Sequence, residues 1–166
     1  MFKVSFIDYD GPCKKVQTFN DKVTVVTLKG RMALPDWWYN IPSDILDWVR
    51  RHPSVDAWES LANNELVIVV QGKTVRAEED EDNPVLAERI AESKAKIKLY
   101  KFLRKLCDKL FRYYHNIVYG NLKVTYQSSC AGIFTDYLLK ASIKYIDLWI
   151  RELEHLDKLL GKSQCH

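Results

Sequence analysis

The chain has 166 residues, of which 47% are hydrophobic and 28% charged, a balance that excludes intrinsic disorder as its overall state. It has no run of about 18 apolar residues and no signal-peptide pattern, so we expect neither membrane insertion nor export. The four cysteines lie far apart without a CxxC pair, which favours a reducing, intracellular setting.

The net charge of +3 is divided unevenly along the chain. Residues 1–82 carry 10 Lys and Arg against 14 Asp and Glu, whereas residues 83–166 carry 15 against 8. The sign changes at the acidic run 78–82, which predicts a boundary between a small β-rich head (1–80) and a helical unit that follows it. Such asymmetry is typical of two halves that attract each other, or of a basic half that meets an acidic partner.

Three strands are expected in the head. The first covers residues 2–7, which alternate between apolar and polar side chains, and the second covers 22–28, which Lys29-Gly30 should end. The third covers 65–70, whose continuous apolar run predicts burial on both faces. Gln71-Gly72 should then turn the chain into a short return strand and so form a hairpin.

Helical spacing between the second and third strands predicts two short helices within residues 42–62. Ser43 is a suitable cap for the first, Pro53 should stop it, and Ser54 should cap the second. Four of the five tryptophans fall in or beside this segment: Trp37, Trp38, Trp48 and Trp58. Large rings can build a small core at this place, or they can form an exposed aromatic interface for a partner.

The second half, 83–166, predicts a long antiparallel helical hairpin. Asn83 and Pro84 suit a helix start and Gly120 a helix end, and the second helix should run from about 132 to 160. The apolar arc of the first helix is about 200° wide, so we expect it to be contacted on two sides. The predicted fold class is therefore α+β: a small mixed head with short helices, followed by the hairpin.

A narrow basic stripe runs along the first long helix and is the candidate partner-binding surface. Its members follow spacings of three and four: Lys94, Lys98, Lys101, Lys105, Lys109 and Arg112. The stripe can be a solvated face, a dock for an acidic protein surface, or a contact for nucleic acid.

The second long helix has a row of residues suited to pack against the first. These are Leu138, Ser142, Ile146, Trp149, Leu153, Leu156 and Leu160. Its outer face carries Asp147 with Arg151 and Glu154 with Lys158, two i,i+4 pairs of opposite sign, and we expect that face to be solvated.

No catalytic constellation is found, so the chain is expected not to be an enzyme and to need no cofactor or metal. Asp8-Tyr9-Asp10-Gly11 resembles the start of haloacid-dehalogenase-type phosphatases, but no later acidic pair accompanies it. The four histidines and four cysteines have no metal-ligand spacing, and no glycine-rich phosphate loop or nucleophile elbow occurs.

Two stretches of the head resemble the epsilon subunit of rotary ATP synthases. They are Asp10-Gly11-Pro12 with the strand and Leu34-Pro35 that follow it, and residues 65–79 before the long helix. That resemblance implies a β-sandwich followed by a helical hairpin on a rotor stalk.

Residues 41–70 are similar to small structural modules of phage virion proteins, through Ile41-Pro42, Trp48-Val49 and His52-Pro53 before a short apolar strand. The functional prediction is a non-enzymatic structural or adaptor subunit of a larger assembly, specifically a head–tail or capsid-associated phage component in a virion or the cytoplasm. Its partners would be copies of itself or other protein subunits. The alternatives are an epsilon-like stalk subunit and a nucleic-acid-binding accessory protein.

Overall fold

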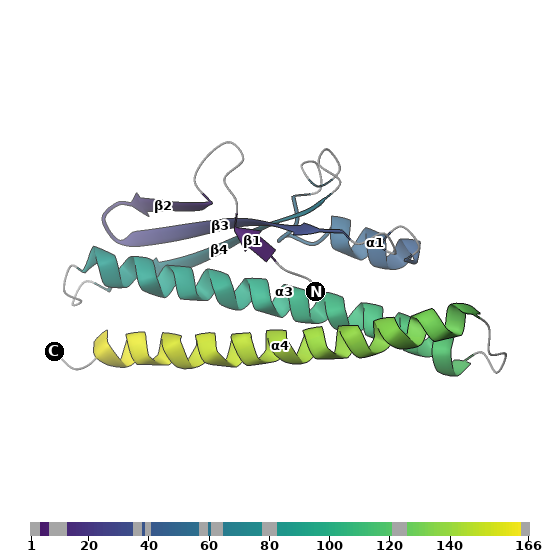
Figure 1. The fold of residues 1–166 in the computed structure, drawn as a ribbon. Helices are drawn as coiled ribbons and strands as arrows, with labels where there is room; N and C mark the ends of the chain where they lie inside the picture. Colours follow the sequence, from purple (N-terminus) through teal and green to yellow (C-terminus); the bar gives the residue numbers. More distant parts are fainter. Residues whose placement is uncertain are drawn as a thin grey trace.

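The computed structural model describes residues 4–6, 13–34, 38, 41–56, 60, 65–77, 83–120 and 126–163. Their elements are β1 (Val4–Phe6), β2 (Lys14–Phe19), β3 (Val23–Ala33), α1 (Ser43–Arg50), β4 (Glu65–Val75), α3 (Pro84–Gly120) and α4 (Tyr126–Ser163). The α+β class and the long helical hairpin are confirmed. Figure 1 shows three layers, with the sheet on one side of α3 and α4 on the other.

The sheet is antiparallel and built around β3. The whole of β3 pairs with β4 on one side, from Val23 opposite Val75 to Ala33 opposite Glu65. Its other edge is shared, because β2 pairs with the first part of β3 and β1 with the part from Gly30 to Met32. Alternate β3 residues are buried, as expected for a sheet with one face on a core.

Three strand predictions were wrong or incomplete. β2 was not predicted, and β3 continues through Lys29-Gly30 because β1 and β4 pair with it on either side at Gly30. Gln71-Gly72 is not a turn: the pair lies within β4, where it faces Thr27 and Val26 of β3, so no hairpin forms there.

The first helix of the insertion is confirmed; most of the second lies outside the described residues, but Ser60 is helical and its N–H donates a hydrogen bond of 3.0 Å to the Asp56 carbonyl oxygen. α1 forms as predicted, although Pro42 rather than Ser43 stands at its N-cap. Val55 forms an isolated bridge with Ile68 instead of entering a helix, and the Ser54 carbonyl accepts a hydrogen bond from the Val69 N–H. This segment therefore covers part of the second edge of β4.

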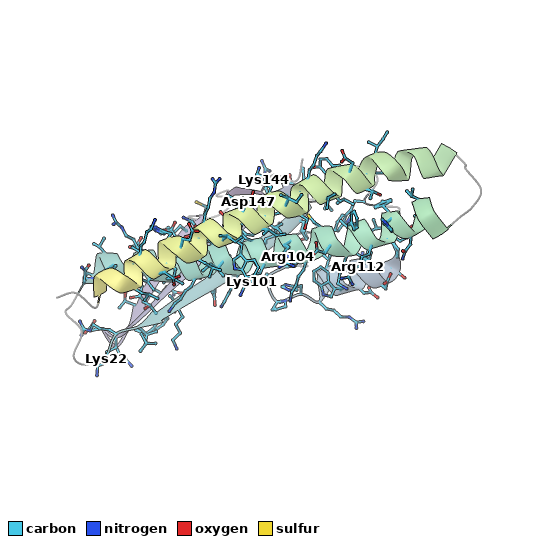
Figure 2. The ribbon with its side chains drawn as sticks, turned by 90° about the horizontal axis from the view of Figure 1, so that it is seen from below. Lys22, Lys101, Arg104, Arg112, Lys144 and Asp147 are labelled. Atoms are coloured by element: carbon cyan, nitrogen blue, oxygen red, sulfur yellow. The ribbon has the colours of Figure 1, made fainter. Side chains whose placement is uncertain are left out.

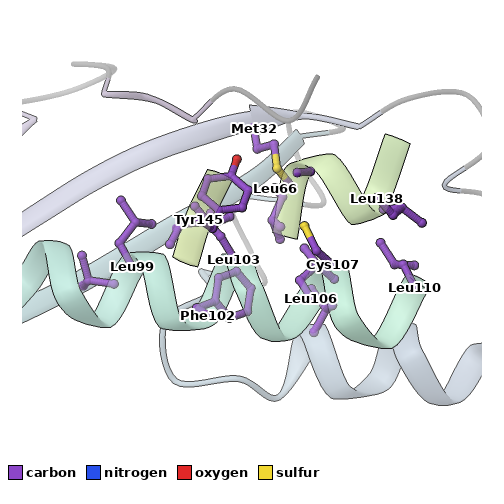
Figure 3. Packing of buried hydrophobic residues seen from close by; sticks show 14 of the residues in the cluster. Met32, Leu66, Leu99, Phe102, Leu103, Leu106, Cys107, Leu110, Leu138 and Tyr145 are labelled. Carbon is purple, nitrogen blue, oxygen red and sulfur yellow. The ribbon is translucent and has the colours of Figure 1, made fainter. Parts of the chain in front are cut away.

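The predicted start of α3 is confirmed by its cap. The Asn83 side-chain oxygen accepts a hydrogen bond of 2.9 Å from the Leu86 N–H. The helix then passes between the sheet and α4, as its broad apolar arc predicted. One hydrophobic cluster joins Met32 and Leu66 of the sheet, Phe102 and its neighbours on α3, and Tyr145 of α4 (Figure 3).

Gly72 is the point of closest approach between the sheet and α3. A Cβ atom there would overlap the Ala91 carbonyl oxygen and lie 2.6 Å from the Ala95 nitrogen. Both alanines are fully buried. Glycine facing alanine thus lets the β4 backbone rest directly on the helix backbone.

An ion-pair cluster ties the edge of the sheet to the first turns of α3. The Lys14 ammonium lies 2.6 Å from Glu88 and also pairs with Glu92, which Lys96 contacts at 2.8 Å. Burial alone would raise the pKa of Glu92, but hydrogen bonds from Lys14 and Lys96 outweigh it and lower that pKa. Hydrogen bonds to Glu88 and Glu92 raise the pKa of Lys14.

Gly72→Ala should lower the free energy of unfolding by about 2–3 kcal/mol, because the added methyl group meets backbone that cannot rotate away. Urea denaturation measures the change. Gly161→Ala is the matched control, since no atom lies within 4 Å of a Cβ there, and it should leave stability unchanged or slightly higher. Equal stability of Gly72→Ala and the native chain would contradict the close approach.

Glu92→Gln should flatten the acid side of the stability profile. Because the folded pKa of Glu92 lies below its ordinary value of 4.5, its contribution is present above that pH and is lost as pH falls through the folded pKa. The difference in unfolding free energy between pH 7 and pH 3 should therefore be smaller in the variant. Glu154→Gln, on the exposed side of α4, is the control, and an unchanged difference in Glu92→Gln would refute the role of the cluster.

Candidate protein-docking surface

The basic stripe is exposed along one side of α3, apart from Lys94, which is half-buried. Figure 2 shows Lys101, Arg104 and Arg112 along this side of the hairpin. The sequence placed the stripe correctly on one face of the helix.

Three members of the stripe contact other parts of their own chain. Lys98 Nζ donates a hydrogen bond of 2.7 Å to the Gln71 carbonyl oxygen of β4. The ammonium of Lys101 lies 5.1 Å from the ring centre of Trp149, and that of Lys109 lies 5.0 Å from the ring centre of Trp48. The two cation–π contacts hold the Lys101 and Lys109 side chains against the fold and restrict where their ammonium groups can lie.

An aromatic cluster lies beside the stripe where α1 meets α3. His52 packs 4.5 Å from the Phe102 ring and 5.3 Å from the Trp48 ring, and its Nδ1 accepts a hydrogen bond from the Ser54 N–H. Burial, and then the charge of Lys105, lower the pKa of His52, so the ring is neutral at pH 7. A surface hollow of about 440 Å³ adjoins it, lined by Asp44, Asp47, Trp48, Arg51, His52 and Pro53.

The described tryptophans serve mainly in packing. Trp38 is buried in the core, and Trp48 is half-buried and stacks on Phe102 with ring centres 5.8 Å apart. The predicted aromatic interface therefore does not include Trp38 as an exposed ring, because its side chain is only 6% accessible. Trp37 and Trp58 lie outside the described residues.

The described part of the chain holds no cluster of metal-ligating side chains, and its buried cysteine is unreactive. No three His, Cys, Asp or Glu residues there lie close enough to hold a metal ion. Burial, and then the charge of Asp108, raise the pKa of the Cys107 thiol to about 12, which keeps it protonated and a poor nucleophile. Nor is any described helix long and apolar enough to cross a membrane.

The exposed side of α4 carries an apolar row beside Asp147, Arg151, Glu154 and Lys158, which are solvent-exposed as the sequence analysis expected. Leu139 is 46% accessible, Ile143 51% and Ile150 46%, and half-buried Ile146 and Leu153 lie between and beyond them. Their spacings of four, three, four and three place all five on one face of the helix. We call these five residues the α4 row.

The expected packing row of α4 mixed two faces. Leu138, Ser142, Tyr145 and Leu159 are buried, whereas Leu160 is exposed and Ile146 and Leu153 belong to the α4 row. Ser142 Oγ donates a hydrogen bond of 2.7 Å to Asp108 of α3, which fixes the inward side. The buried row and the α4 row both have heptad spacing, and Leu138, Ser142 and Tyr145 of the buried row each come directly before a member of the α4 row. A search for a single row therefore combined residues from both.

Trp149 joins the α4 row to the basic side of α3. Lys101 and Arg104 of α3 lie 5.1 Å and 5.6 Å from its ring centre. Ile146 and Leu153 are its neighbours along α4, three residues before it and four after. The apolar row and the cations therefore belong to one continuous surface.

Comparison of the chain with protein-family models, curated proteins and solved structures found no match. The resemblance to the epsilon subunit implies a β-sandwich, whereas the described residues of the head form one four-stranded sheet with the helix α1.

The stripe should bind nucleic acid only weakly, because Lys98 and Lys101 already contact Gln71 and Trp149. We expect a labelled 20-nucleotide single strand to bind with a dissociation constant above about 10 µM at 0.15 M salt, in the range of non-specific binding. Alanine at Lys98, Lys101 and Lys105 should weaken it no more than alanine at Lys140, Lys144 and Lys158, which removes the same charge from α4. A tighter dissociation constant would favour the nucleic-acid alternative if its salt dependence became weaker in the stripe variant but not in the α4 variant.

Proposed function

We propose that this chain is a non-enzymatic structural or adaptor subunit that joins protein partners through the outer face of α4. The observation that carries the proposal is the α4 row, an unbroken line of aliphatic side chains on a helix that packs against α3 on its other side. Single exposed aliphatic side chains are common on protein surfaces, whereas a contiguous apolar patch is typical of an interaction site.

The apolar arc of α3 offers little surface to a partner, because the sheet and α4 cover it on two sides. The spare apolar surface belongs instead to α4. Lys101 and Arg104 flank it across Trp149.

Among the residues that the structure describes, the other exposed apolar side chains form no comparable row. Phe19 and Val75 are 50% and 60% accessible, and both lie opposite Val23 at one end of the sheet. They make a short patch at strand ends, whereas the α4 row extends over four helical turns.

A role in a phage virion is the more specific form of this proposal. It rests on the resemblance of residues 41–70 to virion modules, together with a fold whose described part offers an interaction surface rather than a reactive centre. The epsilon-like stalk subunit stays second, since its implied β-sandwich differs from the single sheet.

A photoreactive amino acid at position 143 should form covalent adducts with a protein partner in the cells or particles that naturally contain the chain. The same group at position 151, on α4 but outside the α4 row, is the control and should give few adducts. Electrophoresis and mass spectrometry of the adducts measure both. Absence of adducts at 143, in a variant that keeps native helicity, would contradict the proposed function.

A further inference from the structure

We infer that the partner of the α4 row is the α4 helix of a second copy of this chain, packed antiparallel. This inference rests on the proposed function and specifies the partner that the same surface takes. A two-fold pair uses one patch twice, so the patch must complement itself in both shape and charge.

Two antiparallel registers, one heptad apart, each give four consecutive apolar layers, and the charges beside the row favour the first. The first register places Leu139 opposite Ile150 of the second copy and Ile143 opposite Ile146 of the second copy, and the two-fold axis repeats each contact. All four side chains are half-buried or exposed in the single chain, so they are available for the contact. Asp136 comes one step before Leu139 in the row and ends the apolar run there.

The charges beside the row complement one another in the first register. Lys140 and Asp147 both follow row residues directly, on the side of α4 away from α3, and both are exposed. Figure 2 places Asp147 on the side of the hairpin opposite Lys101 and Arg104. Antiparallel pairing centred between Ile143 and Ile146 brings Lys140 of each copy beside Asp147 of the other, which forms two reciprocal ion pairs.

A shift by one heptad toward the C-terminus keeps four apolar layers, with Ile143 opposite Leu153 and Ile146 opposite Ile150 of the second copy. It sets the two Asp147 residues against each other, which the first register avoids. Parallel packing sets Lys140 and Asp147 opposite the flank that carries Ser142 and Trp149, neither of which bears a charge. The ion pair of Lys140 with Asp136, at 2.7 Å, is highly exposed and contributes little, so it can exchange for the intermolecular pair.

Four layers make a small interface, at the weak end of specific contacts. We therefore expect a dimer that dissociates in the range of about 1–100 µM rather than a permanent one.

The test is sedimentation equilibrium of the full chain with reversed charges. Lys140→Glu and Asp147→Lys should each weaken self-association at least about tenfold. In either variant, residues 140 and 147 carry charges of the same sign, so both intermolecular pairs become repulsive. An equimolar mixture of the two variants should restore association to near the native level, since every cross-pair is then opposite in sign. Lys158→Glu, exposed on the same helix beyond the four layers, is the control and should associate as the native chain does.

Circular dichroism establishes that each variant keeps its helices before it is compared. Native chain that stays monomeric to 0.5 mM would overturn the inference, and so would a mixture that associates no better than the separate variants. If position 143 still forms adducts with a different protein while the chain is monomeric, the proposed function survives and the second copy is excluded as the partner. If position 143 forms no adducts and the chain is monomeric, both the proposed function and the dimer are refuted.

Discussion

The contact on which the fold depends is the one between Gly72 and α3. Only a residue without a side chain lets β4 lie on the backbone at Ala91 and Ala95, and this distance sets how deeply the sheet sits on the helix. Val70 and Ile68, farther along β4, then reach the buried side of α3. Replacing close packing of this kind by a wider gap would forfeit dispersion contacts along the whole sheet.

From that contact the three layers follow in order. α3 is covered by the sheet on one side and by α4 on the other, so most of its apolar residues are buried within the chain. α4 is the outermost layer and has only α3 to pack against. Hydrogen bonds from Ser142 to Asp108 and from Ser93 to the Glu152 carbonyl oxygen, at 2.7 Å and 3.3 Å, set which side of α4 turns inward. The side left outside is the one that carries the α4 row.

Local signals in the sequence identified the helices better than the strands, although α4 begins at Tyr126 and not at about 132 as predicted. Asn83-Pro84 and Gly120 marked α3 because caps depend on neighbouring residues alone. Gln71-Gly72 was wrongly predicted to be a turn. The glycine is needed because the α3 backbone packs against it, and the residues next to it in the sequence do not reveal that contact. The basic stripe followed from helical spacing, but choosing between the two apolar rows of α4 required knowing where α3 lies. The α4 row could have been suspected from its own heptad spacing.

The shared core has a consequence for how the chain folds. The change of charge at 78–82 divides the sequence but does not divide the cooperative unit, because Met32, Phe102 and Tyr145 belong to one cluster. A fragment ending before α3 would leave the inner face of the sheet in water, and the isolated hairpin would expose the opposite side of α3. The two halves are therefore expected to melt in a single transition, and a nascent head must wait for α3 to emerge before it gains its native stability.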